Sequence, residues 1–151
     1  MQSAHLDLAQ IAREAGGKVV YLGTYQPLPA AFVALVKAEG QLSELMGAQY
    51  AQISERMREG RQHRPDLRWF AQDGMHPGMA TTALMTIAVY EAATGQQPMV
   101  RELCVAPSSF RSIDGTAVLA LHPPPEGNAP RQCVLDTSAM RDLTHLVRSG
   151  E

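Results

Sequence analysis

Apolar positions along the first hundred residues alternate between helical and strand periods. The first helix, predicted to begin at residue 4, carries its apolar side chains three and four residues apart, at Leu8, Ile11, Ala12 and Ala15. Ser3 can cap its start, and Gly16-Gly17 can end it. The continuous apolar run Val19–Leu22 follows, which is typical of a parallel strand covered on both faces.

Residues 29–57 continue with helical spacing. Pro29 suits the first turn of a helix through Glu39, and we expect Gly40 to end that helix. A second helical stripe is then expected at Leu42, Leu45, Met46, Tyr50, Ile53 and Met57. We interpret this stripe as core packing against a sheet rather than as a cofactor or partner groove. The charged residues from 55 to 64 are expected to form a solvated face.

A short strand and a long helix complete this part of the chain. Arg68–Ala71 is predicted to be a short buried strand, and Met79–Thr94 a helix closed by Gly95. Helix, strand, helix, strand and helix is the order of a doubly wound α/β sheet. Two strands make a poor parallel sheet, so the edge of Val19–Leu22 should be left poorly covered. We therefore expect self-association, or binding of a complementary amino-terminal fragment.

From Pro98 the pattern changes to short alternating runs separated by turn residues. Strands are predicted at Val100–Val105, Thr116–Leu121 and Gln132–Leu135, with turns at Asp114-Gly115 and at 123–128. Thr137 or Ser138 can cap a short final helix through Val147. The predicted division is therefore an α/β part at 1–97 and a small β-rich appendage of unknown role at 98–151.

Composition narrows the class of protein. The chain has 151 residues with 45% hydrophobic content, which suits a globular domain. A net charge of −2 gives no reason to expect nucleic acid or an anionic membrane as a partner. The chain has no apolar run of about 20 residues that would span a membrane, and its start lacks the pattern of a secretory signal. As written, the chain is expected in the cytoplasm, whereas a longer parent protein with its own amino-terminal signal could be exported.

The two cysteines, Cys104 and Cys133, are too far apart in sequence for a CxxC motif. They could form one bridge, but in a cytoplasmic protein we expect two reduced, partly buried thiols. Four of the five histidines show no metal-ligand spacing with one another or with the cysteines: His5, His63, His122 and His145. The sequence therefore predicts no metal site and no cofactor.

The residues with the clearest chemical potential are Asp73 and His76, in the segment Asp73-Gly74-Met75-His76-Pro77-Gly78. A carboxylate that accepts the Nδ1 proton of an imidazole fixes its tautomer and leaves Nε2 free to act as a base. The glycines and the proline make the segment a turn, in which the two side chains can converge. The alternative is that Asp73 only orders the turn and His76 is an ordinary loop residue.

The segment resembles the last conserved block of the SGNH hydrolases, the GDSL-type esterases and lipases. That block is Asp-x-x-His, usually followed by Pro, ahead of the final helix of the fold, and Asp73 to Pro77 matches it. Leu84 to Ala92 is similar to the helix that follows, and Lys18–Tyr25 is weakly similar to the preceding core strand. The resemblance covers roughly residues 4 to 97, and it implies a partial flavodoxin-like, three-layer sandwich.

This chain departs from the family pattern in two places. Gly78 and Thr81-Thr82 stand where many members have other residues after His-Pro. More importantly, the Gly-Asp-Ser block that supplies the nucleophile and the Gly-x-Asn-Asp block of the oxyanion hole are both missing. None of the serines has a Gly-Asp-Ser context, neither Ser3, Ser43, Ser54, Ser108, Ser109, Ser112, Ser138 nor Ser149. The chain resembles the carboxyl-terminal half of such an enzyme.

By resemblance, the implied activity is hydrolysis of an ester of unidentified structure by a serine mechanism. His76 would take the proton of the serine and return it to the leaving alcohol, and Asp73 would orient His76. The nucleophile and oxyanion donors lie outside this chain, so the isolated chain is expected to be inactive. Two alternatives stay open: a noncatalytic binding or interaction domain derived from the SGNH fold, and an unrelated α/β domain with a structural Asp-His turn.

Overall fold

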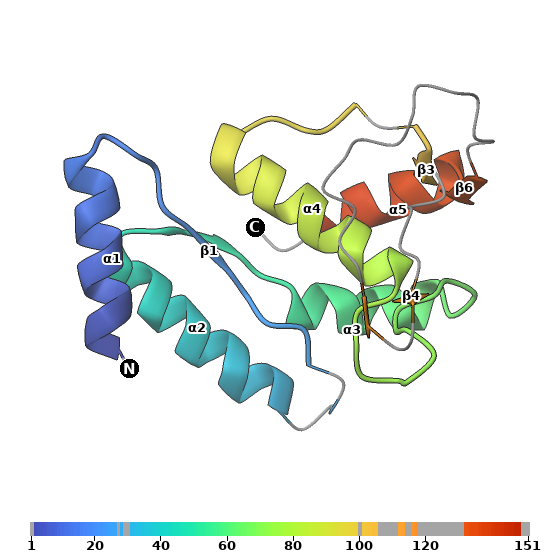
Figure 1. Cartoon of the computed structure of the whole chain (residues 1–151), viewed down its shortest axis with the longest axis horizontal. Helices are drawn as coiled ribbons and strands as arrows, with labels where there is room; N and C mark the ends of the chain where they lie inside the picture. The colour runs from blue at the N-terminus through green and yellow to red at the C-terminus, as the bar shows by residue number, and fades with distance from the viewer. Residues whose placement is uncertain are drawn as a thin grey trace.

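The computed structural model describes residues 2–26, 28, 31–99, 101–105, 112–113, 116–117 and 132–148 (Figure 1). Its elements, in chain order, are α1 (Gln2–Glu14), β1 (Val20–Leu22), α2 (Phe32–Met46), β2 (Gln49–Ala51), α3 (Ser54–His63), α4 (Met79–Thr94), β3 (Leu103–Val105), β4 (Ser112–Ile113), β5 (Thr116–Ala117), β6 (Gln132–Leu135) and α5 (Thr137–Arg148). This mixture of helices and small sheets agrees with the predicted α/β class. Several predicted features lie outside the described residues: Pro29, Val100, the turns at 114–115 and 123–128, and positions 118–121.

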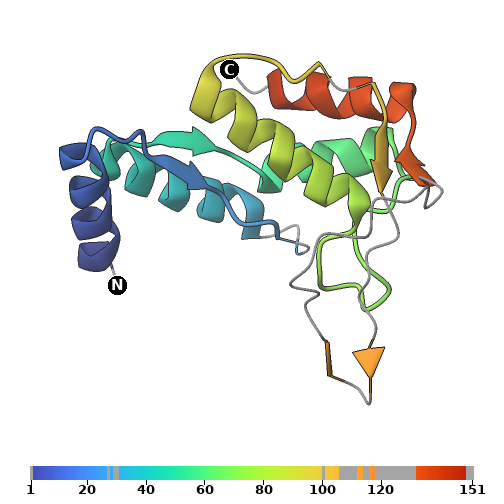
Figure 2. The ribbon, with the colours of Figure 1, turned by 45° about the horizontal axis from the view of Figure 1, so that its top comes forward.

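The centre of the first part is a two-stranded parallel sheet between helices. β1 pairs with β2 in the register Val20 to Gln49, Tyr21 to Tyr50 and Leu22 to Ala51. Successive side chains of a strand point to opposite faces. On one face Tyr50 reaches α2, where its hydroxyl donates to Glu39 at 2.6 Å. On the other face Ala51 belongs to the buried core with Leu84 of α4. Figure 2 shows the strands between α2 and α4 accordingly.

A buried carboxylate joins the ends of this sheet to α2. Glu39 is 4% exposed, and its Oε1 accepts from the amide and the hydroxyl of Thr24, at 2.8 and 2.7 Å. Its Oε2 accepts from Tyr50, whose pKa is raised mainly by burial and further by this hydrogen bond. A buried carboxylate is tolerated only when it is well hydrogen-bonded. These bonds therefore stabilise the arrangement in which β1 and β2 lie against α2.

Two predicted elements between residues 42 and 71 are wrong. The apolar stripe over 42–57 is not one helix, because α2 ends at Gly47 in the left-handed conformation and β2 and α3 follow. Gly47 has φ of 59°, and its amide donates to the Glu44 carbonyl at 2.9 Å. Arg68–Ala71 is not a strand but holds only one bridge, between Phe70 and Pro77. The second strand of the sheet therefore lies at 49–51.

Gly40 does not end a helix, contrary to the prediction, because α2 runs through it to Met46. A Cβ built at Gly40 meets no atom within 4 Å. Gly40→Ala should therefore stabilise the chain by about 0.5–1 kcal/mol, since alanine loses less backbone freedom in a helix. Urea denaturation measures this, with Gly47→Ala as the matched control. The control should destabilise the chain, because Gly47 has a positive φ. An unchanged or lower stability of Gly40→Ala would contradict the prediction.

α1 forms close to its predicted position, but it begins at Gln2, so Ser3 lies inside the helix and does not cap it as predicted. The two large apolar side chains of its predicted face are exposed. Leu8 is 67% and Ile11 62% exposed, whereas Ala9 is buried. The helix packs against α2 rather than on a strand. It therefore offers apolar surface to solvent in the described part of the molecule.

The main core is shared between α4, α3 and α5. Its buried residues include Met57, Trp69, Leu84, Leu143 and Val147. Arg64 adds an ion pair across this core, with Nη1 2.5 Å from Oδ2 of Asp142 on α5. The final helix thus packs into the core of the first part. The predicted division at 97/98 stays a prediction.

The last elements follow the prediction in outline. β6 has the predicted bounds, while β3 is shorter than predicted and pairs antiparallel with it. α5 is capped by Asp136, whose Oδ1 accepts from the Ala139 amide at 2.8 Å, and not by Thr137 or Ser138. None of the helices in the described ranges is long and apolar enough to cross a membrane.

Candidate functional site

The Asp73–His76 loop is held by backbone hydrogen bonds at its base. The Ala71 amide donates to the His76 carbonyl at 2.9 Å, and the Gly78 amide donates to the Trp69 carbonyl at 2.9 Å. Gly74, at the tip, has φ of 70°, a conformation that favours glycine. Two antiparallel arms therefore present the loop, although no regular strand precedes it.

Asp73 and His76 are brought together as their spacing predicts. Oδ2 of Asp73 lies 2.5 Å from Nδ1 of His76. Oδ1 of Asp73 accepts from the amides of Met75 and His76, at 2.9 and 3.0 Å. The carboxylate thus orders the turn and also orients the imidazole, so a structural role and a catalytic role of this pair are compatible. The His76 side chain has no other hydrogen bond to a described residue, so its Nε2 can face a reacting group.

The loop lies toward the carboxyl ends of the parallel strands. α4 begins directly after it, and the Thr81 hydroxyl of α4 lies 3.6 Å from Sδ of Met57 on α3, the helix that follows β2. At its other end, α4 lines a cavity together with Val19 and Gln49, at the amino ends of the strands. In α/β sheets, the carboxyl ends of the strands are where ligands usually bind.

Both side chains are accessible, with 48% of Asp73 and 76% of His76 exposed. The pKa of Asp73 is lowered well below its ordinary value, first by the His76 side chain and then by the amides of His76 and Met75. The carboxylate is therefore charged throughout the neutral range, as an orienting group must be.

His76→Ala should raise the pKa of Asp73 without restoring its ordinary value of 3.8, because the two amide donors remain. A carbon-13 NMR titration of the Asp73 carboxyl measures this directly. Any stability that the pair contributes is present above the unfolded pKa of 3.8 and is lost as the pH falls toward the lowered value. A normal carboxyl pKa in the unmodified chain would contradict the described geometry.

The serines of the described ranges do not complete a triad. Ser43 and Ser54 are buried, and their hydroxyls donate to the carbonyls of Gly40 and Thr24, at 2.7 and 2.6 Å. Ser3 and Ser138 are exposed on α1 and α5. Of the serines whose side chains the structure describes, Ser3, Ser43, Ser54 and Ser138, none is hydrogen-bonded to His76. Ser108, Ser109 and Ser149 lie outside the described residues, as does His122.

A cavity of about 670 Å³ lies at the carboxyl end of α4, away from the Asp73–His76 loop. Several lysine and arginine side chains line it. Arg13 donates to the Met46 carbonyl, and Lys18 donates to the Ala93 carbonyl at 3.4 Å. Cations near helix carboxyl ends satisfy unpaired carbonyls and complement the helix dipole. These two cations therefore have a structural role, and the cavity is separate from the Asp73–His76 pair.

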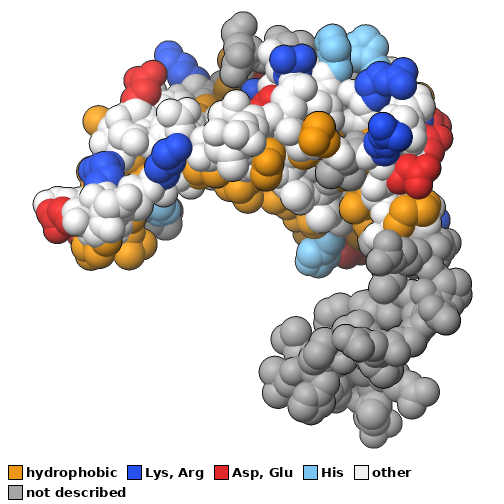
Figure 3. Space-filling view, turned by 90° about the horizontal axis from the view of Figure 1, so that it is seen from above, with side chains coloured by type: hydrophobic (Ala, Val, Ile, Leu, Met, Phe, Trp, Pro, Cys, Tyr) orange, Lys and Arg blue, Asp and Glu red, His pale blue; other side chains and the backbone are white. Residues whose placement is uncertain are grey.

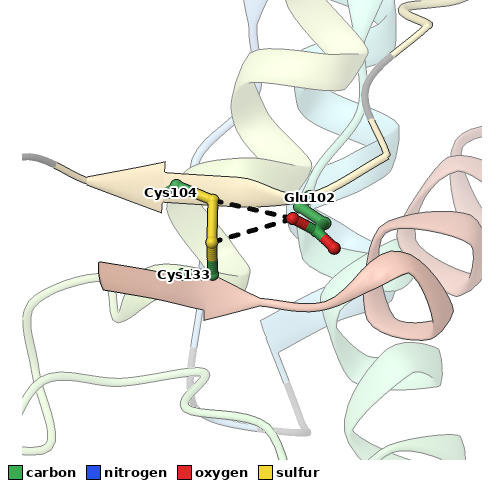
Figure 4. The surroundings of a disulfide bond; sticks show 3 residues. All are labelled: Glu102, Cys104 and Cys133. Carbon is green, nitrogen blue, oxygen red and sulfur yellow. Dashed lines mark hydrogen bonds between the residues drawn. A yellow bond between two sulfur atoms is a disulfide. The ribbon is translucent and has the colours of Figure 1, made fainter. Parts of the chain in front are cut away.

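The predicted pair of reduced thiols is wrong, because Cys104 and Cys133 form a disulfide (Figure 4). The antiparallel pairing of β3 with β6 places the two residues directly opposite each other. Glu102 lies beside both sulfurs. The 29-residue separation gave no local signal for this pairing, which depends on a long-range strand register.

β1 presents an open edge, as the incomplete sheet predicts. The Gln49 amide donates to Val19 and the Gly23 amide to Ala51, each at 2.9 Å, so these positions of β1 face β2. By alternation, the backbone groups of Val20 and Leu22 point the other way. Among the described residues β1 pairs with β2 alone, and Leu22 is 40% exposed. Figure 3 shows hydrophobic side chains along the hollowed side of the described part.

In comparisons with known proteins, no family model, no curated protein and no solved structure matches this chain.

Proposed function

We propose that this chain carries the acid–base half of an SGNH-type serine ester hydrolase. The observation that supports the proposal best is the pairing of Asp73 with Nδ1 of His76 at 2.5 Å, with Nε2 directed away from the pair. The resemblance of Asp73 to Pro77 to the family's last block and the parallel pairing of β1 with β2 are consistent with it.

In the proposed reaction, Nε2 of His76 takes the proton of a serine hydroxyl as that oxygen attacks the ester carbonyl. The protonated imidazole then gives the proton to the leaving alkoxide. Water next attacks the acyl-serine ester, with His76 taking the proton of the water and giving it to the serine oxygen. Asp73 stabilises the imidazolium and fixes its orientation. Removal of a base of this kind typically lowers the rate by about 10²–10⁴-fold.

The serine and the oxyanion donors would come from a separate stretch of polypeptide that adds a strand beside β1. Val20 and Leu22 offer backbone groups that pair with no described residue, and α1 offers the exposed side chains of Leu8 and Ile11. α1 packs mainly against α2. The added strand would therefore also cover the exposed apolar side chains of α1.

Light scattering of the isolated chain, and of the chain co-expressed with the polypeptide encoded immediately upstream, tests this arrangement. We expect self-association of the isolated chain and a one-to-one complex on co-expression. Leu22→Lys should weaken both, whereas Leu45→Lys, on the exposed surface of α2, should change neither. A cooperatively unfolding monomer that binds no such partner would favour the noncatalytic reading of the domain.

A further inference from the structure

Glu102, Cys104 and Cys133 form the one group in the described part of the chain where three side chains of metal-ligand type converge (Figure 4). One ligand atom from each residue lies within 4.8 Å of the others. We propose that, once a dithiol reductant has opened the disulfide, these side chains bind one divalent ion of the Zn²⁺ or Cd²⁺ type through two thiolates and one carboxylate.

The position of the carboxylate supports this site. Oε2 of Glu102 lies 3.9 Å from Sγ of Cys104 and 3.7 Å from Sγ of Cys133. The sulfurs of a disulfide carry no hydrogen, so neither can donate to this oxygen in the oxidised state. A negative group beside two sulfurs becomes favourable when the sulfurs carry protons or share a cation with it.

The distances also suit a tetrahedral ion. With Zn–S of about 2.3 Å and Zn–O of about 2.1 Å, tetrahedral ligands lie about 3.6 Å apart for oxygen and sulfur and about 3.8 Å apart for two sulfurs. The carboxylate oxygen is thus already near its ligand spacing. Only the sulfurs, which are bonded to each other in the oxidised chain, must separate.

Charge and access favour a soft metal ion. Two thiolates and one carboxylate carry three negative charges, and thiolates select ions such as Zn²⁺ and Cd²⁺ over Mg²⁺ or Ca²⁺. Glu102 and Cys133 are exposed and Cys104 is half-buried, so an ion can enter and water can take the fourth position.

The chemistry needs one external reactant, the dithiol. The dithiol breaks the sulfur–sulfur bond by supplying two electrons and two protons, and it becomes a disulfide itself. The metal ion then displaces the two thiol protons. The same residues thus hold either a covalent link between β3 and β6 or a metal link, and this site is independent of the Asp73–His76 pair.

Titration of the chain with Cd²⁺ tests the proposal, because thiolate-to-metal charge transfer gives an ultraviolet absorption band. The chain is reduced with a dithiol, which is then removed under argon. We expect one Cd²⁺ per reduced chain and no band for the oxidised chain. Glu102→Gln should weaken binding at least about tenfold, the size typical for losing part of a metal site. Glu102→Asp should recover part of the loss, and Glu44→Gln, on the exposed side of α2, should bind like the unmodified chain.

Binding that is equally tight in Glu102→Gln would overturn the proposal, since it would show that two thiols alone capture the ion. Absence of the band in the reduced chain would overturn it as well. Thermal unfolding of the reduced chain gives a second readout, because an ion that binds the folded site raises the Tm. We expect Cd²⁺ to raise the Tm of the reduced chain clearly more than that of reduced Glu102→Gln; an equal rise in both would contradict the site.

Discussion

Gly78→Ala should destabilise the chain by about 3 kcal/mol, at the upper end of the usual cost of inserting atoms into a packed site. A Cβ at this position would lie 2.4 Å from the Arg68 carbonyl oxygen and 2.8 Å from the carbonyl carbon and oxygen of Phe70. These are backbone atoms, so no side chain can turn away to make room. The backbone itself must shift, at the expense of the hydrogen bond from the Gly78 amide to Trp69.

The glycine at the tip of the same loop provides the control for urea denaturation of Gly78→Ala. A Cβ at Gly74 would meet nothing within 4 Å, so Gly74→Ala should cost only about 1–2 kcal/mol, for its φ of 70°. Gly78→Ala should also reduce the lowering of the Asp73 pKa, because the arm that carries His76 is displaced. If Gly78→Ala were no more destabilising than Gly74→Ala, the close approach of the two arms would be refuted.

The second large effect concerns the disulfide. Replacing Cys104 and Cys133 together with serine should lower the free energy of unfolding by about 3–4 kcal/mol, because the bond closes a loop of 29 residues and restricts the unfolded chain. The loss should appear in denaturation curves of the oxidised protein. Reductant should destabilise the unmodified chain by a similar amount and leave the double variant unchanged. A loss below about 1 kcal/mol would show that strand pairing alone holds β3 to β6.

Local sequence patterns predicted correctly an element such as α4, which glycines bound at both ends. α4 has the predicted bounds because Gly78 permits the close approach before it and Gly95, with φ of 68°, ends it. The Asp73–His76 contact was predictable for the same reason, since both residues belong to one short turn.

The errors arise where distant contacts decide the structure. The spacing of apolar residues at 42–57 fits a helix, but Tyr50 is drawn into β2 by its ladder with β1 and its bond to Glu39. Gly40 is tolerated inside α2, because one glycine costs a helix only about 1 kcal/mol. The disulfide depends on the register of β3 and β6, which no local pattern specifies.

We propose that His76 is the base of an ester hydrolase whose nucleophile lies on another stretch of polypeptide. Hydrolysis of a short p-nitrophenyl ester tests it most directly, by the chain alone and by the chain co-expressed with the upstream polypeptide, each compared with His76→Ala. Alone, the chain should be no faster than its His76→Ala variant. In the complex, His76→Ala should lower kcat/KM by about 10²–10⁴-fold. His76-dependent turnover by the isolated chain, or turnover by the complex that does not depend on His76, would contradict the account.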